Sequence, residues 1–147
     1  MVSDLAVNLL IEKSSIKIIS LVAIQDNEVI GHIAYSPVFS MGSGEHFAYI
    51  LAPLAISPHY QKNKIGSSLV QNGLDTISNM GSYIIFVYGD PQYYSRFGFN
   101  TDLAKNFPPQ HSLQHPEGWQ ALKLDSSIHS EGGTIKCVDS LDDPNLW

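Results

Sequence analysis

The order of apolar and polar segments between residues 51 and 89 constrains the fold most strongly. An apolar run, LAPLAIS, is followed by the polar turn QKNKIG and then by apolar residues at helical spacing, namely Ile65, Leu69, Leu74 and Ile77. Gly81 ends this segment, and a second apolar run, YIIFVYG, follows at once. A helix between two such runs is typical of a crossover between parallel strands. The pattern predicts that residues 51–57 and 83–89 are parallel neighbours, with the second strand buried on both faces.

The rest of the chain predicts a mixed sheet flanked by helices. Two β-branched runs in residues 16–38 are separated by Gln25-Asp26-Asn27-Glu28, which is typical of an antiparallel hairpin. Pro53 cannot donate a backbone hydrogen bond, so we expect a bulge or an unpaired position there. Further expected elements are a short helix in SDLAVNLLIEKS with an N-cap at Ser3, a short helix in PQYYSRFG, and late strands in WQALKL and GTIKCV. At 147 residues, the chain fits a single α+β domain over 1–147.

Composition narrows the classes of partner. Fourteen acidic residues against eight basic ones give a net charge of −6, which disfavours nucleic acid and anionic membranes and favours a cationic partner. The single Cys137 cannot form an internal disulfide, and no apolar stretch is long enough for a membrane span or a signal peptide. These observations predict a soluble protein in the reducing cytoplasm.

The turn QKNKIG has the properties of an anion site. A strand that enters a helix through a short turn points several free N–H groups, and the positive end of the helix dipole, at one place. Such a place attracts phosphate. Lys62 and Lys64 add positive charge, and Gly66 allows close approach to the backbone. The alternative from the turn alone is that Gly66 eases entry into the helix while both lysines are solvated surface.

Two separated segments together resemble the GNAT superfamily of N-acetyltransferases, in its bacterial predicted-acetyltransferase branch. The family has an L-x-I strand, a Q/R-x-x-G-x-G/A turn, a long helix, a buried strand and a short helix ending in Y-x-x-x-G-F. The corresponding segments here are LAI, QKNKIG, residues 65–79, YIIFVYG and YSRFGF, and GHIA is similar to the family's G-x-I strand. The resemblance covers about residues 21–99 and implies a splayed central sheet.

The resemblance implies an activity and a site. The enzyme would transfer an acetyl group from acetyl-CoA, its acyl-donor cosubstrate, to a primary amine of a small molecule or peptide, by direct attack in a ternary complex and without a metal. The main chain of the turn would bind the CoA diphosphate, the pantetheine arm would pair with the strand before it, and the N–H of Leu54 would polarise the thioester carbonyl. Tyr94 would donate a proton to the leaving thiolate. The implied cofactor-binding residues are Leu54, Ala55, Ile56, Gln61, Lys62, Asn63, Lys64, Ile65, Gly66 and Ser67.

The chain departs from the family pattern in two places. Ahead of the hairpin it offers only SDLAVNLLIEKS, so the family's N-terminal strand and a helix are expected to be missing. A second subunit would then complete the acceptor wall, which is why we expect a homodimer. Lys64 replaces the first glycine of the turn, and a positive φ there would cost about 1–2 kcal/mol. A non-catalytic acyl-CoA-binding or regulatory module is therefore the alternative function, and a phosphate-binding interaction domain is a third.

The general base is left open by the sequence. An attacking ammonium must first lose a proton, and the candidates are Glu45, His46 and Asp90, each of which also fits a structural role. Tyr93 is a weaker candidate than Tyr94 for the acid, and Arg96 is interpreted as structural. His111 and His115 have the spacing of a metal pair, but the prolines around them predict a loop. Cys137 is interpreted as a packed thiol.

Overall fold

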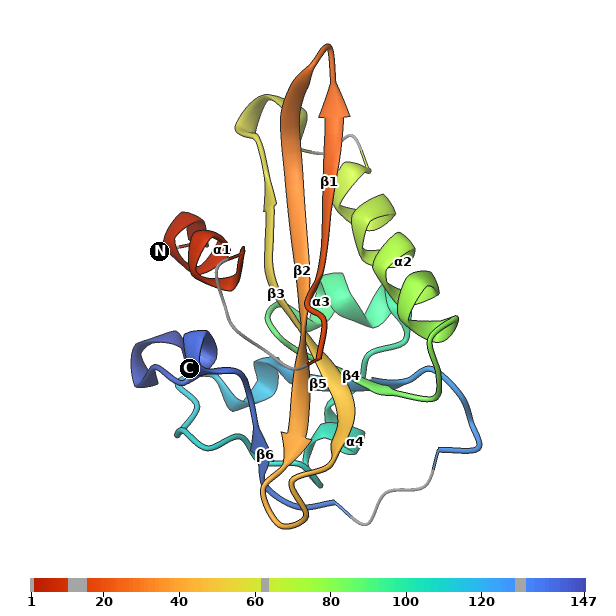
Figure 1. The fold of residues 1–147 in the computed structure, drawn as a ribbon, viewed down its shortest axis with the longest axis vertical. Coiled ribbons are helices and arrows are strands. Elements are labelled where there is room, and N and C mark those ends of the chain that lie inside the picture. Colours follow the sequence, from red (N-terminus) through yellow and green to blue (C-terminus); the bar gives the residue numbers. More distant parts are fainter. Residues whose placement is uncertain (1, 11–15, 62–63, 129–131) are drawn as a thin grey trace.

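The computed structural model describes residues 2–10, 16–61, 64–128 and 132–147, and Figure 1 shows their arrangement. One six-stranded sheet has the order β1-β2-β3-β4-β5, with β6 pairing with β2. Only β3 and β4 are parallel neighbours, and the other pairs are antiparallel. The strands are β1 (Ile19–Gln25), β2 (Glu28–Ser40), β3 (His46–Ile56), β4 (Ile84–Tyr88), β5 (Trp119–Lys123) and β6 (Ile135–Lys136). The helices are α1 (Val2–Leu10), α2 (Ile65–Ser78), α3 (Pro91–Tyr94) and α4 (Thr101–Ala104). The predicted mixed α+β fold is confirmed.

The hairpin between β1 and β2 turns where the sequence predicts. Asp26 and Asn27 have φ angles of 51° and 64°, and they separate the paired residues Gln25 and Glu28. Two successive residues with positive φ form the type of tight turn whose twist matches that of the strands, and Asp and Asn tolerate this conformation. The local sequence therefore sets the register of this hairpin.

The sheet opens between β3 and β4. Their parallel pairing runs from Ala48 with Ile84 to Leu51 with Val87, whereas β3 continues to Ile56. The β2–β3 register shifts across Ala52 and Pro53, because two steps along β2 face three along β3. This shift confirms the predicted irregularity at Pro53. Because the pairing with β4 ends at Leu51, residues 52–56 of β3 are unpaired on the side of β4.

Helix α2 covers one face of the sheet, on the opposite side from α1 (Figure 1). Its buried residues Leu69, Val70, Leu74 and Ile77 follow the predicted helical spacing. Tyr35 of β2 is fully buried beneath α2, and its hydroxyl donates to the carbonyl of Val70 at 2.8 Å. Gly73 provides the space for the Tyr35 ring, because a Cβ at residue 73 would lie only 2.0 Å from Tyr35 Cε2.

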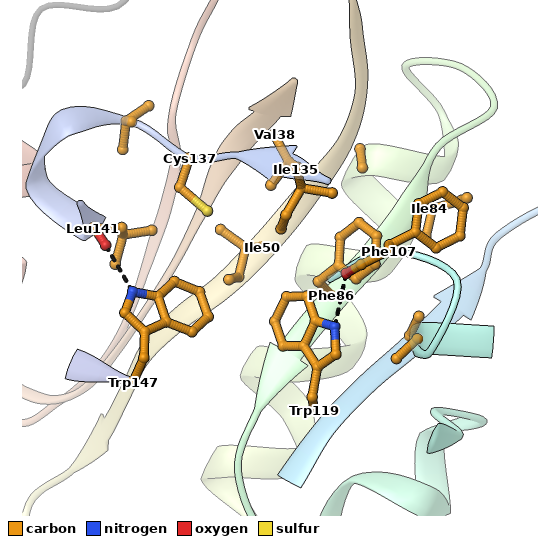
Figure 2. Close-up of a cluster of buried hydrophobic side chains, with 14 of the residues drawn as sticks. Val38, Ile50, Ile84, Phe86, Phe107, Trp119, Ile135, Cys137, Leu141 and Trp147 are labelled. Carbon is orange, nitrogen blue, oxygen red and sulfur yellow. Dashed lines mark hydrogen bonds between the residues drawn. The ribbon is translucent and has the colours of Figure 1, made fainter. Parts of the chain in front are cut away.

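The other face carries an aromatic core, shown in Figure 2. The rings of Phe86 and Trp119 stack with centroids 5.1 Å apart. Both buried indoles donate hydrogen bonds, Trp119 to the carbonyl of Phe107 and Trp147 to that of Leu141, each at 3.0 Å. The Trp119 bond fixes the loop at Phe107 to β5, whereas the Trp147 bond joins two parts of the C-terminal segment to each other.

Two local predictions need correction. Ser3 was expected to cap the first helix, but α1 begins at Val2, so Ser3 lies inside it. Of GTIKCV, only Ile135 and Lys136 form a strand, and they pair with Phe39 and Ser40 at the end of β2. Because β2 ends at Ser40, residues before Ile135 have no strand residue to pair with.

Candidate active site

A cleft of about 740 Å³ lies where β3 and β4 separate, and we call it the β3–β4 cleft. One wall comes from the end of β3 and the start of α2, and the other from the loop after β4 and from α3. The residues that line it are Leu54, Ile56, Tyr60, Gln61, Lys64, Ile65, Gly66, Ser67, Gly89, Asp90, Tyr93, Tyr94 and Arg96. Most of the site residues predicted from the sequence therefore lie together in this cleft.

Among the predicted cofactor-binding residues that the structure describes, Ala55 alone does not line the cleft. Lys62 and Asn63 lie outside the described residues. Ala55 pairs with His32 in β2, and because side chains alternate along a strand it points to the opposite face from Leu54 and Ile56. Only the backbone of Ala55 is therefore available on this side.

The N-terminus of α2 opens onto the cleft. The first hydrogen bond of the helix runs from the N–H of Ser68 to the carbonyl of Lys64 at 3.0 Å, so the N–H groups of Ile65, Gly66 and Ser67 come before the helical ladder. Lys64 is the N-cap residue with φ 62°, which confirms the left-handed conformation considered from the sequence. The N–H groups that have no partner within the helix, the helix dipole and the Lys64 ammonium together make this wall electropositive.

Gln61 supports the turn from the side of the strand. Its side-chain amide donates to the carbonyl of Ile56, the last residue of β3, at 3.3 Å. This contact links the end of the strand to the residue just before the turn, as expected for a residue that supports the loop. Gln61 is itself exposed and lines the cleft, so one side chain both holds the turn and faces its opening.

Tyr93 and Arg96 are site residues whose position the sequence did not reveal. A Cβ at residue 66 would lie 2.8 Å from the Tyr93 hydroxyl oxygen, so this hydroxyl rests against the first turn of α2. The Arg96 guanidinium stacks on the Tyr93 ring at 4.4 Å, and its Nε donates to the Tyr93 carbonyl at 3.1 Å. Arg96 is structural, as interpreted, and it also brings a cation to the cleft. The available signal was the Tyr-to-Arg spacing of three residues on a single helical turn.

Tyr94 lies deeper, against the backbone of Gly89. A Cβ at residue 89 would be 2.7 Å from Tyr94 Cε2, so only glycine accommodates the ring there. Burial, with smaller contributions from the neighbouring Tyr93 and Asp90, raises the pKa of Tyr94 to about 12. The phenol is therefore neutral throughout the physiological range and acts as a hydrogen-bond donor.

Of the three candidate bases, only Asp90 lines the cleft. Its carboxylate accepts from the N–H of Gln92 at 2.9 Å and so caps α3. Glu45 and His46 stand at the other end of β3, and the His46 ring contacts Tyr49 and Tyr83 and bonds the carbonyl of Ala48. Since a strand of this length spans roughly 30 Å, neither residue reaches the cleft.

The remaining candidates have structural roles. His111 lies in a loop, as predicted, and bonds Asp142 at 2.7 Å. In the described ranges no group of three His, Cys, Asp or Glu side chains is placed to hold a metal ion. Burial raises the pKa of Cys137 to about 12, so it is a packed thiol and not a nucleophile. None of the described helices is long and apolar enough to cross a membrane.

A splayed mixed sheet, a helix N-terminus facing the splay and a partly buried tyrosine beside it are the arrangement expected for an acyl-CoA-dependent acetyltransferase of the GNAT type. The model of the acetyltransferase (GNAT) family matches residues 7–99. The chain is 30% identical over 141 residues to the Escherichia coli protein named uncharacterized N-acetyltransferase YjhQ, covering 93% of this chain and 78% of YjhQ. The chain therefore belongs to the GNAT acetyltransferase family.

Two further relatives have solved structures. Escherichia coli YhbS, named an uncharacterized N-acetyltransferase, is 40% identical over 96 residues, which span 61% of this chain and 56% of YhbS. Its crystal structure in complex with CoA superposes with a TM-score of 0.75 and 29% identity, over 84% of this chain and 69% of that one. A GNAT family acetyltransferase from Brucella melitensis, in complex with acetyl-CoA, has a TM-score of 0.65 and 30% identity, over 84% and 68% of the two chains.

Proposed function

We propose that this protein transfers an acetyl group from acetyl-CoA directly to a primary amine while both substrates are bound. The observation that carries the proposal is the electropositive N-terminus of α2 at the β3–β4 cleft, where the sheet is open. The relatives crystallised with CoA and with acetyl-CoA share this fold over most of the chain, which supports the same cosubstrate here.

In this proposal the cosubstrate is held mainly by backbone. The N–H groups of residues 62–67 bind the diphosphate, with Lys64 adding charge and Gln61 supporting the turn. The pantetheine arm lies along residues 54–56 and pairs with the strand edge that β4 leaves free. The N–H of Leu54 polarises the thioester carbonyl and stabilises the oxyanion.

Tyr94 then acts on the sulfur atom. An aliphatic thiol has a reference pKa of about 8.5, so full proton transfer from a phenol with a pKa of about 12 is unfavourable by about 5 kcal/mol. A hydrogen bond from the neutral phenol to the developing thiolate has no such penalty and strengthens as charge builds up. Tyr94 therefore stabilises the leaving group as a donor, a narrower role than complete proton donation.

The bond changes are those of acyl transfer. The ammonium of the acceptor loses one proton to solvent, and the free amine attacks the acetyl carbonyl carbon to form the C–N bond. Collapse of the tetrahedral intermediate breaks the C–S bond. The nitrogen loses its second proton, and the thiolate takes up one proton to give free CoA, so one proton is released overall.

Calorimetry with acetyl-CoA is the first test. We expect saturable binding that weakens as salt is raised, because the contacts to the diphosphate are ionic. Absence of binding to any acyl-CoA at millimolar concentration would eliminate both the transferase and the acyl-CoA-binding module, and would leave a phosphate-binding interaction domain.

A non-catalytic acyl-CoA-binding module is the second candidate, favoured by one observation. Lys64 occupies a left-handed conformation in which the family pattern has glycine, and such strain weakens a tight cradle. A thiol-release assay over a panel of amines separates the two: release above the hydrolysis background supports the enzyme, and binding without release supports the module.

The single domain over 1–147, the homodimer and the cytoplasmic location stay predictions. Apolar side chains are exposed on the hairpin formed by β1 and β2, where Ile24 and Val29 are each 64% exposed. Sedimentation velocity at several concentrations measures the oligomeric state, and a monomer at all of them would contradict the homodimer.

A further inference from the structure

A second cavity of about 350 Å³ lies at the carboxyl end of β4, and we call it the β4-end pocket. Residues 88–91 form one wall, and His115, Glu117 and Gly118 form the other. None of the functions assigned above uses this pocket, except that Asp90 belongs to both cavities.

Gly89 and Asp90 line both the β4-end pocket and the β3–β4 cleft, so the two cavities meet at this point of the backbone. The Tyr94 ring packs against one side of Gly89, where a Cβ would be 2.7 Å from the ring. On the other side, a Cβ at residue 118 would be 2.9 Å from the Gly89 carbonyl oxygen. Because residues 89 and 118 are both glycine, neither adds a side chain at the point where the pocket and the cleft meet.

The walls of the pocket are held in place by hydrogen bonds. The N–H of His115 donates to the Tyr88 hydroxyl at 2.7 Å, and the N–H of Gly89 donates to the carbonyl of Gly118 at 2.9 Å. The side-chain amide of Gln120, which is buried, donates to the Gly89 carbonyl at 3.2 Å. These bonds join two segments that are far apart in sequence into one preformed cavity.

The chemistry of the lining is acidic at two points and apolar between them. Asp90 uses one carboxylate oxygen to cap α3, which leaves the other free to accept. Glu117 belongs to the opposite wall, and its carboxylate lies 3.7 Å from His115 Nδ1. Tyr88 and Pro91 supply apolar surface. Lysine and arginine are absent from the described residues that line this pocket, and the basic side chain in its lining is that of His115.

We propose that the β4-end pocket binds the acceptor and that the acceptor is a short aliphatic diamine. The reacting amine lies at Asp90, next to the β3–β4 cleft, the alkyl chain lies against Tyr88 and Pro91, and the second ammonium lies at Glu117. This inference rests on the proposed acetyl transfer, because it names the substrate class of that reaction. Asp90 and Glu117 bind substrate here and are not required to accept its proton.

The test uses three acceptors with the same carbon chain and different charge. Their kcat/KM values are measured by thiol release with saturating acetyl-CoA: 1,4-diaminobutane carries two ammonium groups, butylamine carries one, and 4-aminobutanoate carries one together with a carboxylate. We expect kcat/KM to be highest for the diamine, lower for the monoamine and lowest for the amino acid. If kcat/KM for butylamine equals or exceeds that for 1,4-diaminobutane, the proposal is wrong.

Glu117→Gln separates the two carboxylate sites. Because the Glu117 side chain is 69% exposed, its ion pair with the second ammonium should change kcat/KM only a few-fold. We expect kcat/KM to fall about three- to fivefold for 1,4-diaminobutane and to change less than twofold for butylamine. Asp90→Asn retains the helix cap, since Asn is an equally good capping residue, and should lower kcat/KM for both amines. Glu28→Gln, at the exposed start of β2, is the matched control with the same change of charge.

A direct binding measurement distinguishes failure of this inference from failure of the proposed function. The His115 ring resonances are followed by NMR while 1,4-diaminobutane is added to protein saturated with CoA, or to the free protein if CoA does not bind. A saturable shift that Glu117→Gln weakens supports the pocket even without turnover. Acetyl-CoA binding with no shift and no diamine preference refutes the inference alone, whereas absence of acetyl-CoA binding refutes the proposed function.

Discussion

The Tyr35 ring of β2 packs directly against Gly73 of α2, and Gly73→Ala tests the importance of this contact. An added Cβ would lie 2.0, 2.7 and 2.9 Å from three atoms of the Tyr35 ring. An ordinary contact needs about 3.4 Å or more, so the ring or the helix would have to move by more than 1 Å. Tyr35 is fully buried and its hydroxyl is bonded to the Val70 carbonyl, so neither partner has free space.

The expected loss of stability combines three effects. Overpacking of a dense core costs about 1–3 kcal/mol. Displacing the ring breaks the bond from Tyr35 to Val70 and leaves buried polar atoms unsatisfied, which costs about 1–3 kcal/mol. Alanine gains about 1 kcal/mol over glycine in a helix interior. The free energy of unfolding should therefore fall by about 1–5 kcal/mol, which lowers the melting temperature by about 2–20 °C for a chain of this size.

Urea unfolding followed by tryptophan fluorescence measures this change, because both tryptophans, Trp119 and Trp147, are buried. Asn72→Ala, at an exposed position of the same helix, is the control and should change stability by less than about 0.5 kcal/mol. Adding Tyr35→Leu to Gly73→Ala should give a smaller loss than the sum of the two single changes, since leucine leaves space for the Cβ. A Gly73→Ala protein as stable as the parent would refute the packing argument.

Three further predictions concern the site and its surroundings. Tyr94→Phe should lower kcat about 10- to 100-fold, the value of a hydrogen bond to a charged group, while calorimetry shows acetyl-CoA affinity unchanged within about twofold; an equal loss of affinity would assign the hydroxyl to binding. Lys64→Gly should raise the free energy of unfolding by about 0.5–1 kcal/mol in urea, because glycine adopts positive φ without strain, and should weaken acetyl-CoA binding a few-fold at low salt; lower stability would contradict the strain. Burial raises the pKa of Cys137 from 9.0 to about 12, so the folded state keeps a proton that the unfolded state releases, and this stabilisation is lost as pH rises through that range. Between pH 8 and 10 the parent should therefore lose about 1 kcal/mol more stability than Cys137→Val, and equal losses would exclude the thiol as the cause.

Local sequence was sufficient for the parts of the fold that depend on neighbouring residues. The hairpin turn at Asp26 and Asn27 and the irregularity at Pro53 each follow from the conformational limits of one or two residues. The positive φ of Lys64 was considered only because the family pattern has glycine at that position. The parallel pairing of β3 and β4 follows from the helix between them, because a crossover leaves few alternatives. These features also position the β3–β4 cleft.

The features that the sequence did not reveal depend on contacts between distant segments. Tyr93 reaches Gly66 only because α3 is placed against the first turn of α2, and no spacing within either segment encodes that contact. The β4-end pocket brings together Asp90 and Glu117 across an irregular stretch that has no hydrophobic period to place it. Glu45 and His46 were considered as candidate bases because they open the strand that leads to the cleft, but an extended strand carries its two ends far apart.

The division of labour between main chain and side chains explains why family and cosubstrate are easier to infer than the acceptor. At the β3–β4 cleft the proposed contacts are backbone amides at a helix N-terminus and a strand edge, and any sequence that forms the turn presents them. At the β4-end pocket, by contrast, the charge comes from Asp90 and Glu117, which are both exposed. Glu117 can change without disturbing the fold, and asparagine at residue 90 would keep the cap of α3. Acceptor choice is thus carried by a few replaceable side chains, and paired substitutions at these two positions should alter amine preference while acetyl-CoA affinity stays the same.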